Sequence, residues 1–176
     1  IILDDLTKSA MIDIKPGDFT DYDLEGFWHD RPVPFLFTGF GATRTISAPH
    51  MIATLIYHLE VIVGQDIILV GSKGGYLAAL IDRMVGEYGS VTVIEPNEEV
   101  RLYAEGRLSR HRCSGEIRVI RPNDVDEIEH LSGGCERVLI TGSVREIPIF
   151  VEDLVIDGGF VLGPFGGCLL YTSPSP

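Results

Sequence analysis

Several features that would place this chain outside the ordinary globular class are scarce or missing. Its 176 residues include only three cysteines and one tryptophan, and no run of 18 apolar residues occurs. A membrane-spanning helix needs about 20 apolar residues, so the sequence predicts none. Cys113, Cys135 and Cys168 are widely spaced and form no C-x-x-C or Cys/His cluster. We therefore expect reduced thiols, with neither a metal site nor a disulfide framework.

The chain also has few positively charged residues. The chain has 14 Lys and Arg residues against 26 Asp and Glu residues, a formal net charge of -12. That balance repels phosphate backbones and anionic lipid heads, so we expect no nucleic-acid or membrane partner. Hydrophobic residues make up 45% and charged residues 23%, which is ordinary globular usage. We expect a cytoplasmic monomer built around a single core.

The two ends of the sequence need separate treatment. The chain begins at Ile1 without a methionine, so we expect the natural start to lie upstream. The last nine residues, CLLYTSPSP, match the translation of a transposase-end sequencing adapter, in which TGT CTC TTA TAC ACA TCT encodes Cys-Leu-Leu-Tyr-Thr-Ser. We interpret 168–176 as an adapter-derived scar; the alternative is a native tail rich in Pro and Ser.

Short apolar runs alternate with helical periodicity from Asp66 onward. The runs expected to form strands are rich in Val, Ile and Leu and cover residues 67–70, 91–94, 117–120, 138–141 and 160–162. Helices are expected at 52–63, at 77–84, after the potential cap Asn97, after Asp124 and from 148 to 154. Strict alternation of strand and helix predicts a parallel α/β sheet with right-handed crossovers.

Residues 1–44 differ from the rest, being acidic at first and then rich in Pro and aromatic residues. We interpret them as an N-terminal lid or subdomain packed beside an α/β domain that spans 45–167. Trp28, His29 and Asp30 could line a substrate cleft or could latch the lid onto the sheet, and the sequence leaves both possibilities open.

A glycine-rich turn follows the first expected strand of the sheet, in the stretch ILVGSKGGYLAAL. A turn of this kind between strand and helix lets a nucleotide-like ligand approach the backbone at Gly71, Gly74 and Gly75. Glu95 closes the next strand, where a carboxylate typically accepts hydrogen bonds from ribose hydroxyls. The pattern indicates an adenosine-containing ligand, although α/β units also turn in this way without one. It is not a P-loop, because no G-x-x-x-x-G-K-[ST] occurs.

The segment GATRTISAPHM at 41–51 resembles the protein-L-isoaspartate O-methyltransferase family, and dinucleotide dehydrogenases have nothing like it. FWHDRPVP at 27–34, VLITGS at 138–143 and DGGFVLGPFGG at 157–167 extend the resemblance. It implies a Rossmann-like class I S-adenosylmethionine-dependent methyltransferase sheet with an N-terminal lid, from which the last strands are missing. It also implies S-adenosyl-L-methionine as cofactor and isoaspartyl-containing proteins or peptides as substrates for repair.

The resemblance assigns roles to individual positions. Ser47 matches the family's active-site serine, beside the transferable methyl group and the acceptor carboxylate. The positions implied to bind the cofactor are Thr45, Ile46, Gly71, Gly75, Glu95 and Asn123. For Ser47 and Thr45 the alternative is capping of the following helix. His50 is interpreted as structural.

Two positions in the glycine turn depart from the family pattern. Leu69 stands where the family has an acid that binds the positively charged amino group of the methionine moiety. Lys73 stands where the family has the middle glycine of the turn. A lysine there places a cation near a sulfonium ligand, and like charges repel. These departures motivate an alternative function, a catalytically inactive paralogue that binds protein or peptide without S-adenosylmethionine.

Overall fold

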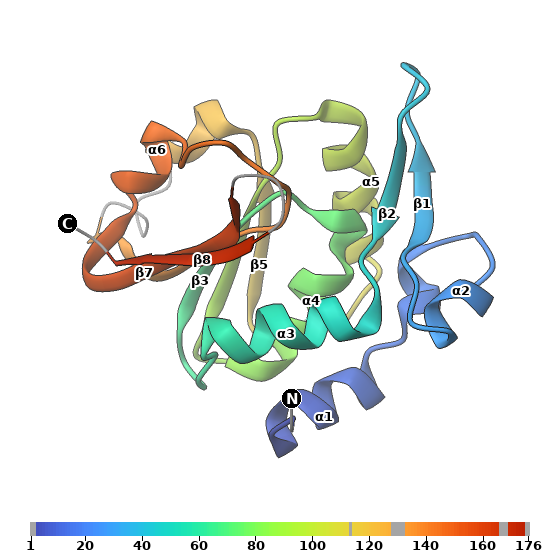
Figure 1. The fold of residues 1–176 in the computed structure, drawn as a ribbon. Coiled ribbons are helices and arrows are strands. Elements are labelled where there is room, and N and C mark those ends of the chain that lie inside the picture. The colour runs from blue at the N-terminus through green and yellow to red at the C-terminus, as the bar shows by residue number, and fades with distance from the viewer. Residues whose placement is uncertain (1–2, 113, 128–132, 166–168, 175–176) are drawn as a thin grey trace.

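A six-stranded sheet forms the centre of the computed structural model, which describes residues 3–112, 114–127, 133–165 and 169–174. The strand order is β5-β4-β3-β6-β7-β8, and the first five strands run parallel (Figure 1). The strands are β3 (Asp66–Val70), β4 (Ser90–Ile94), β5 (Glu116–Ile120), β6 (Cys135–Ile140), β7 (Val155–Phe165) and β8 (Leu169–Pro174). The expected parallel α/β sheet is confirmed.

Helices cover both faces of this sheet. The first face carries α3 (Pro49–Leu59), α4 (Tyr76–Val85) and α5 (Glu98–Leu108), whose apolar residues join those of β3 and β4 in one core cluster. The second face carries the 3₁₀ helix η3 (Pro122–Glu127) and α6 (Ile149–Glu152), which share a second cluster with β6. Central strands buried on both faces explain the continuous Val, Ile and Leu runs of the sequence.

The N-terminal segment packs beside the first face. It comprises α1 (Asp5–Asp13), η1 (Pro16–Phe19), α2 (Glu25–Trp28) and an antiparallel hairpin of β1 (Val33–Phe37) and β2 (Thr43–Ile46). Phe19 and Phe27 are buried and contact Tyr76 of α4. Trp28 is 69% exposed and contacts the ring of Phe27, so the buried aromatic contacts with α4 come from the two phenylalanines. The hairpin crosses residue 44, where the predicted lid ends, and the division into lid and domain stays a prediction.

Several element boundaries differ from those expected. Helix α3 ends at Leu59 because Glu60 adopts a left-handed conformation with φ 54°, which leaves Val63 outside the helix and exposed. The segment after Asp124 belongs to a 3₁₀ helix that ends at Glu127, and the rest of the helix expected there, at 128–132, lies outside the described residues. Among the described residues, no helix has the length and apolarity that crossing a membrane requires.

The edge of the sheet at β7 is covered. The missing last strands implied by the resemblance would leave an open edge at 160–162, but β8 pairs antiparallel with this strand, with Phe160 opposite Pro174 and Leu162 opposite Thr172. The expectation is wrong because the tail itself supplies the missing backbone partners. The adapter origin of this tail stays a prediction.

Candidate functional site

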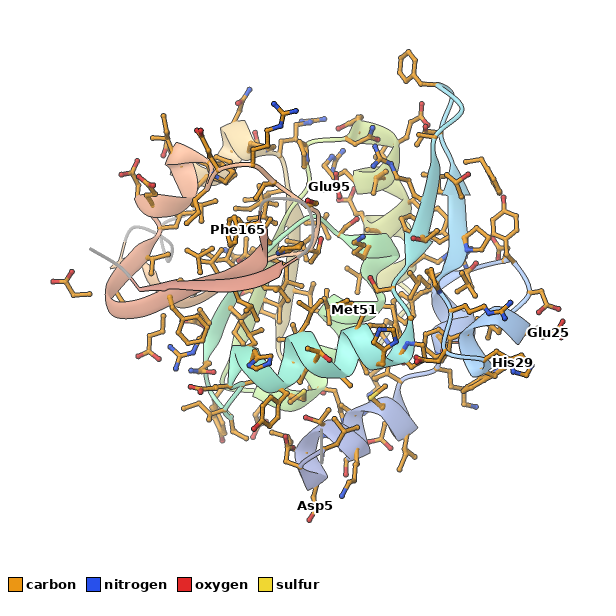
Figure 2. All side chains as sticks on the ribbon, viewed as in Figure 1. Asp5, Glu25, His29, Met51, Glu95 and Phe165 are labelled. Carbon is orange, nitrogen blue, oxygen red and sulfur yellow. The ribbon has the colours of Figure 1, made fainter. Side chains whose placement is uncertain are left out.

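A cavity of about 290 Å³ opens at the carboxyl ends of the central strands. This is the edge at which parallel α/β sheets bind ligands. Figure 2 shows Glu95 at this edge, on the opposite side of the molecule from Asp5 in α1. The lining comes from the hairpin, the turn after β3, and the residues that follow β4 and β6: Phe35, Thr43, Arg44, Thr45, Val70, Gly71, Ser72, Lys73, Glu95, Pro96, Val100, Ile140, Thr141, Gly142, Ser143 and Val144.

The glycine turn packs so tightly that side chains are excluded at Gly71 and Gly75. Gly71 has φ 97°, and a Cβ atom there would lie 2.4 Å from Oγ1 of Thr141. That hydroxyl oxygen lies 2.9 Å from the carbonyl oxygen of Gly71 and so ties the turn to the end of β6. Gly75 has φ 95° and faces Leu108 of α5. Both predicted glycines are therefore required by the backbone, but only Gly71 lines the cavity.

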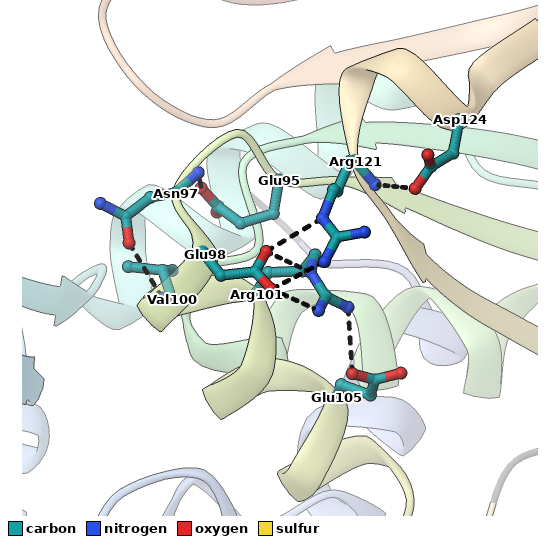
Figure 3. Close-up of polar contacts among 8 residues, drawn as sticks. All are labelled: Glu95, Asn97, Glu98, Val100, Arg101, Glu105, Arg121 and Asp124. Atoms are coloured by element: carbon teal, nitrogen blue, oxygen red, sulfur yellow. Dashed lines mark hydrogen bonds and ion pairs between the residues drawn. The ribbon is translucent and has the colours of Figure 1, made fainter.

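Glu95 holds the turn and the start of α5 together. Its Oε2 accepts a hydrogen bond of 2.8 Å from the backbone N–H of Ser72, and its Oε1 accepts one of 3.0 Å from that of Asn97. The side-chain oxygen of Asn97 in turn accepts from the N–H of Val100, which caps α5 as predicted (Figure 3). Each carboxylate oxygen has a further lone pair, so the buried Glu95 retains acceptor capacity toward the cavity.

An ion-pair network on α5 borders this side of the site (Figure 3). Glu98 accepts from Arg101 and from Arg121, whose Nη2 lies 2.8 Å from Oε1. These hydrogen bonds, first those from Arg101, hold the pKa of Glu98 well below its usual range. The network joins α5 to the segment after β5. Asn123 lies two residues beyond Arg121, is exposed and does not line the cavity, so its proposed contact with a cofactor stays a prediction.

Ser47 lines a second, smaller hollow next to the cavity. The hollow is lined by Ile46, Ser47, Ile52, Leu55, Lys73, Tyr76, Leu77 and Thr141, and Lys73 and Thr141 also line the main cavity. The structure thus brings Thr45, Gly71 and Glu95 together around one cavity and places Ser47 and Ile46 beside it. Tyr76 is buried there, and this burial raises its pKa to about 12.

Neither Ser47 nor Thr45 caps helix α3. The N-cap residue is Ala48, which makes no side-chain capping bond. Asp30, which is not part of the helix, binds the first turn of α3. Its Oδ1 accepts a hydrogen bond of 2.9 Å from the N–H of His50, and its Oδ2 lies 2.8 Å from Nδ1 of His50. The hydrogen bond from the His50 backbone lowers the pKa of Asp30. His50 thus joins the start of α3 to Asp30, and its structural interpretation stays a prediction. The side chain of Ser47 is not used as a helix cap.

Three lining residues were missed by the sequence analysis. Oγ of Ser72 is buried without a hydrogen-bond partner among the described residues, which leaves a polar group for a ligand. Thr141 anchors the turn, and Arg44 brings a second cation to the cavity. A polar residue directly after an apolar strand could have indicated Thr141. Nothing in the sequence could have indicated that the hairpin carrying Arg44 folds over the turn.

Three charged side chains line the cavity, and two of them, Arg44 and Glu95, change the pKa of the third, Lys73, in opposite directions. Burial lowers the pKa of Lys73, and the nearby Arg44 lowers it further, while Glu95 acts in the opposite direction. Leu69, at the position of the family acid, is fully buried in β3. Among the described residues, no group of three or more His, Cys, Asp or Glu side chains could hold a metal ion.

The sheet order, the glycine turn after β3 and the carboxylate after β4 define a Rossmann-like α/β domain. The family model for protein-L-isoaspartate(D-aspartate) O-methyltransferase matches residues 1–169. The chain therefore belongs to this family, as the resemblance of its sequence implied.

Individual relatives agree with this assignment. A protein-L-isoaspartate O-methyltransferase of Methanococcus maripaludis is 33% identical over 73% of this chain and 59% of its own length. One of Pyrobaculum islandicum is 29% identical over 93% of this chain and 77% of its own length. The chain thus spans about three fifths of the first relative. A crystal structure from Plasmodium falciparum, of a protein-L-isoaspartate O-methyltransferase in complex with S-adenosyl-L-homocysteine, shares the fold with a TM-score of 0.78 at 22% identity, covering 99% of this chain and 84% of that chain.

Proposed function

We propose that this chain binds S-adenosylmethionine and methylates the carboxylate of isoaspartyl residues in damaged proteins or peptides. The observation that carries the proposal is the cavity in which Thr45, Gly71 and Glu95 meet, with Ser47 in the adjoining hollow. Family membership supports the same reaction. We also propose that the chain acts as a monomer in the cytoplasm.

One end of the cavity fits an adenosyl group. The Glu95 carboxylate would accept hydrogen bonds from ribose hydroxyls, since its oxygens keep lone pairs beyond those used by Ser72 and Asn97. The unpartnered hydroxyl of Ser72 offers a further hydrogen bond, and Gly71 lets the ligand approach the backbone. This part of the cavity, lined by Gly71, Ser72 and Glu95, is called the nucleoside end below.

The reaction needs little acid–base help from the protein. When bound, S-adenosylmethionine supplies a methyl group on a positively charged sulfur. The acceptor carboxylate is already ionised at neutral pH, because its pKa lies near 4. Ser47 would orient this carboxylate by donating a hydrogen bond, and the apolar wall of its hollow would exclude water.

Methyl transfer to a defined peptide tests the proposal. The chain is incubated with labelled S-adenosylmethionine and a peptide containing one isoaspartyl residue, and a peptide of the same sequence with aspartyl serves as control. We expect a base-labile methyl ester on the isoaspartyl peptide alone. Label on neither peptide, with the folded protein at high concentration, would contradict the proposal.

Leu69 and Lys73 favour a second candidate, a catalytically inactive relative that binds protein or peptide without S-adenosylmethionine. Both replace residues that the family uses around the donor, and Leu69 is buried where an acid would stand. Calorimetric titration separates the two candidates. The second candidate predicts heat on adding peptide but none on adding S-adenosylmethionine, whereas the proposed enzyme gives heat with the donor.

A further inference from the structure

The cavity is positively charged inside a strongly acidic protein. Among the described residues that line it, Arg44 and Lys73 are cationic and Glu95 alone is acidic, while the whole chain carries a net charge of -12. Both oxygens of Glu95 already accept backbone hydrogen bonds. The carboxylate is therefore held at the nucleoside end and cannot swing toward the two cations.

Lys73 lies at the junction of the two hollows. It lines the main cavity and also the small hollow that contains Ser47, and Thr141 is the other residue common to both. If the acceptor lies beside Ser47 and the ribose beside Glu95, the sulfur of the donor must lie between them, next to Lys73. We call this region, lined by Arg44 and Lys73, the sulfur end.

The backbone fixes Lys73 in this place. The residue has φ 46°, a left-handed conformation, within the 3₁₀ helix η2 (Lys73–Gly75) that leads into α4. Within the described part of the chain its ammonium has no ion pair closer than 4.0 Å, and the position of the family acid is held by the buried Leu69. Its charge at the sulfur end is therefore not offset by a direct partner.

We propose that Lys73, assisted by Arg44, makes this site select adenosyl ligands with an uncharged sulfur over those with a sulfonium. The favoured ligand class is the adenosyl thioether, for which S-adenosylhomocysteine is the probe, and the disfavoured one is the sulfonium donor. The inference rests on the proposed function, because it assumes that an adenosyl ligand occupies the cavity. It assigns to Lys73 a specificity-determining role.

The selectivity depends on pH in a defined direction. Two charged groups face Lys73, Arg44 from the hairpin and Glu95 from the end of β4, and the titratable phenol of Tyr76 on α4 lines the same hollow. Burial and Arg44 together lower the pKa of Lys73. As the pH rises through this lowered value the ammonium becomes neutral, so its repulsion of a sulfonium disappears. Affinity for S-adenosylmethionine should then increase relative to that for S-adenosylhomocysteine.

Isothermal titration of the whole chain with both ligands tests the inference. The measured quantity is the ratio of the two dissociation constants, in which contributions common to both ligands cancel. For wild type, this ratio of S-adenosylmethionine to S-adenosylhomocysteine should fall by about tenfold as the pH is raised from neutral through the lowered pKa of Lys73. Lys73→Met, which removes the charge and keeps the length, should lower the ratio about tenfold at pH 7 and remove its pH dependence.

Lys8→Met is the matched control. Lys8 lies on α1, pairs with Asp5 and lines none of the cavities described above, so removing its charge should leave the ratio unchanged. Ligand binding with a ratio that neither Lys73→Met nor pH alters would overturn the inference and leave the proposed function intact. Absence of heat with either ligand, in wild type and variant alike, would overturn both.

Discussion

The two ends of the cavity are built in different ways. At the nucleoside end, Glu95 binds the backbone of the turn and of α5, so the group that would contact a ligand also holds the fold together. At the sulfur end, Lys73 and Arg44 line the cavity, and their side chains make no hydrogen bond or ion pair to the described residues. Residues such as Lys73 and Arg44, whose side chains make no such contacts, can be replaced without loss of the fold. Lys73, one of the two departures from the family pattern, lies at this end.

The largest effect is expected from a side chain placed in the turn at the nucleoside end. Gly71→Ala would bring a Cβ atom to 2.4 Å from Oγ1 of Thr141 at φ 97°. We expect a loss of about 3–4 kcal/mol in the free energy of unfolding, because clash and backbone strain add, together with loss of S-adenosylhomocysteine binding. Urea unfolding and calorimetric titration measure these changes.

Gly41→Ala is the control for backbone strain. Gly41 has φ 78° but no atom within 4 Å of the added Cβ, so only the strain of about 1–2 kcal/mol remains. Equal destabilisation by the two variants would show that the contact with Thr141 has no energetic importance.

Removing the carboxylate should weaken both fold and binding. Glu95→Ala leaves the N–H groups of Ser72 and Asn97 without their acceptor, which costs about 2–4 kcal/mol of stability. Glu95→Gln keeps one acceptor oxygen and should lose roughly half as much. Affinity for S-adenosylhomocysteine should fall about tenfold to a hundredfold in Glu95→Ala. Unchanged stability with weakened binding would separate the two roles that we combine in this residue.

Ser47→Ala should lower the rate of methyl transfer and leave the affinity for the cofactor nearly unchanged. Ser47 lines the hollow beside the cavity and does not cap α3, so its loss should lower kcat on the order of tenfold with little change in affinity for S-adenosylhomocysteine. Steady-state kinetics and titration provide the two numbers. An equal loss in both would indicate that Ser47 shapes the site and does not orient the acceptor.

Substitutions at the sulfur end should leave the fold intact. Lys73→Gly relieves the left-handed conformation at φ 46°, so we expect it to be about 0.5–1 kcal/mol more stable than Lys73→Met. Both variants should bind S-adenosylmethionine more tightly than wild type. Weaker binding by both would contradict the repulsion argument.

The pH dependence of stability gives the smallest effect. Because the pKa of Lys73 is lowered in the folded state, the unfolded chain binds more protons between this value and the ordinary 10.5. Stability should therefore rise with pH in this window, and the rise should be absent from Lys73→Met. The difference between the unfolding curves of the two proteins isolates this group, and identical pH profiles would contradict the assigned shift.

Most of the fold could be predicted from sequence because buried parallel strands and helix caps have local signals. The strands at 67–70, 91–94 and 117–120 and the cap at Asn97 follow from apolar runs and from one side chain that bonds its own helix. The end of α3 depends on one left-handed residue, Glu60, which has no such signal. The pairing of β8 with β7 depends on a contact between segments, which periodicity does not report.

The site was only partly predictable for the same reason. Gly71 and Glu95 belong to a motif with fixed spacing along one strand–turn–helix–strand unit, so their proximity follows from the chain itself. Arg44 and Thr141 reach the cavity from the hairpin and from β6, and Ser72 stands out only because its hydroxyl has no partner among the described residues. Such features arise from tertiary packing and have no counterpart in residue spacing.

A crystal structure of the chain with S-adenosylhomocysteine would test the assignment of the two ends most directly. The account predicts ribose hydroxyls within hydrogen-bond distance of the Glu95 carboxylate and a thioether sulfur beside Lys73, facing the hollow of Ser47. A ligand bound with the opposite orientation, or outside the cavity between β3, β4 and the hairpin, would contradict it.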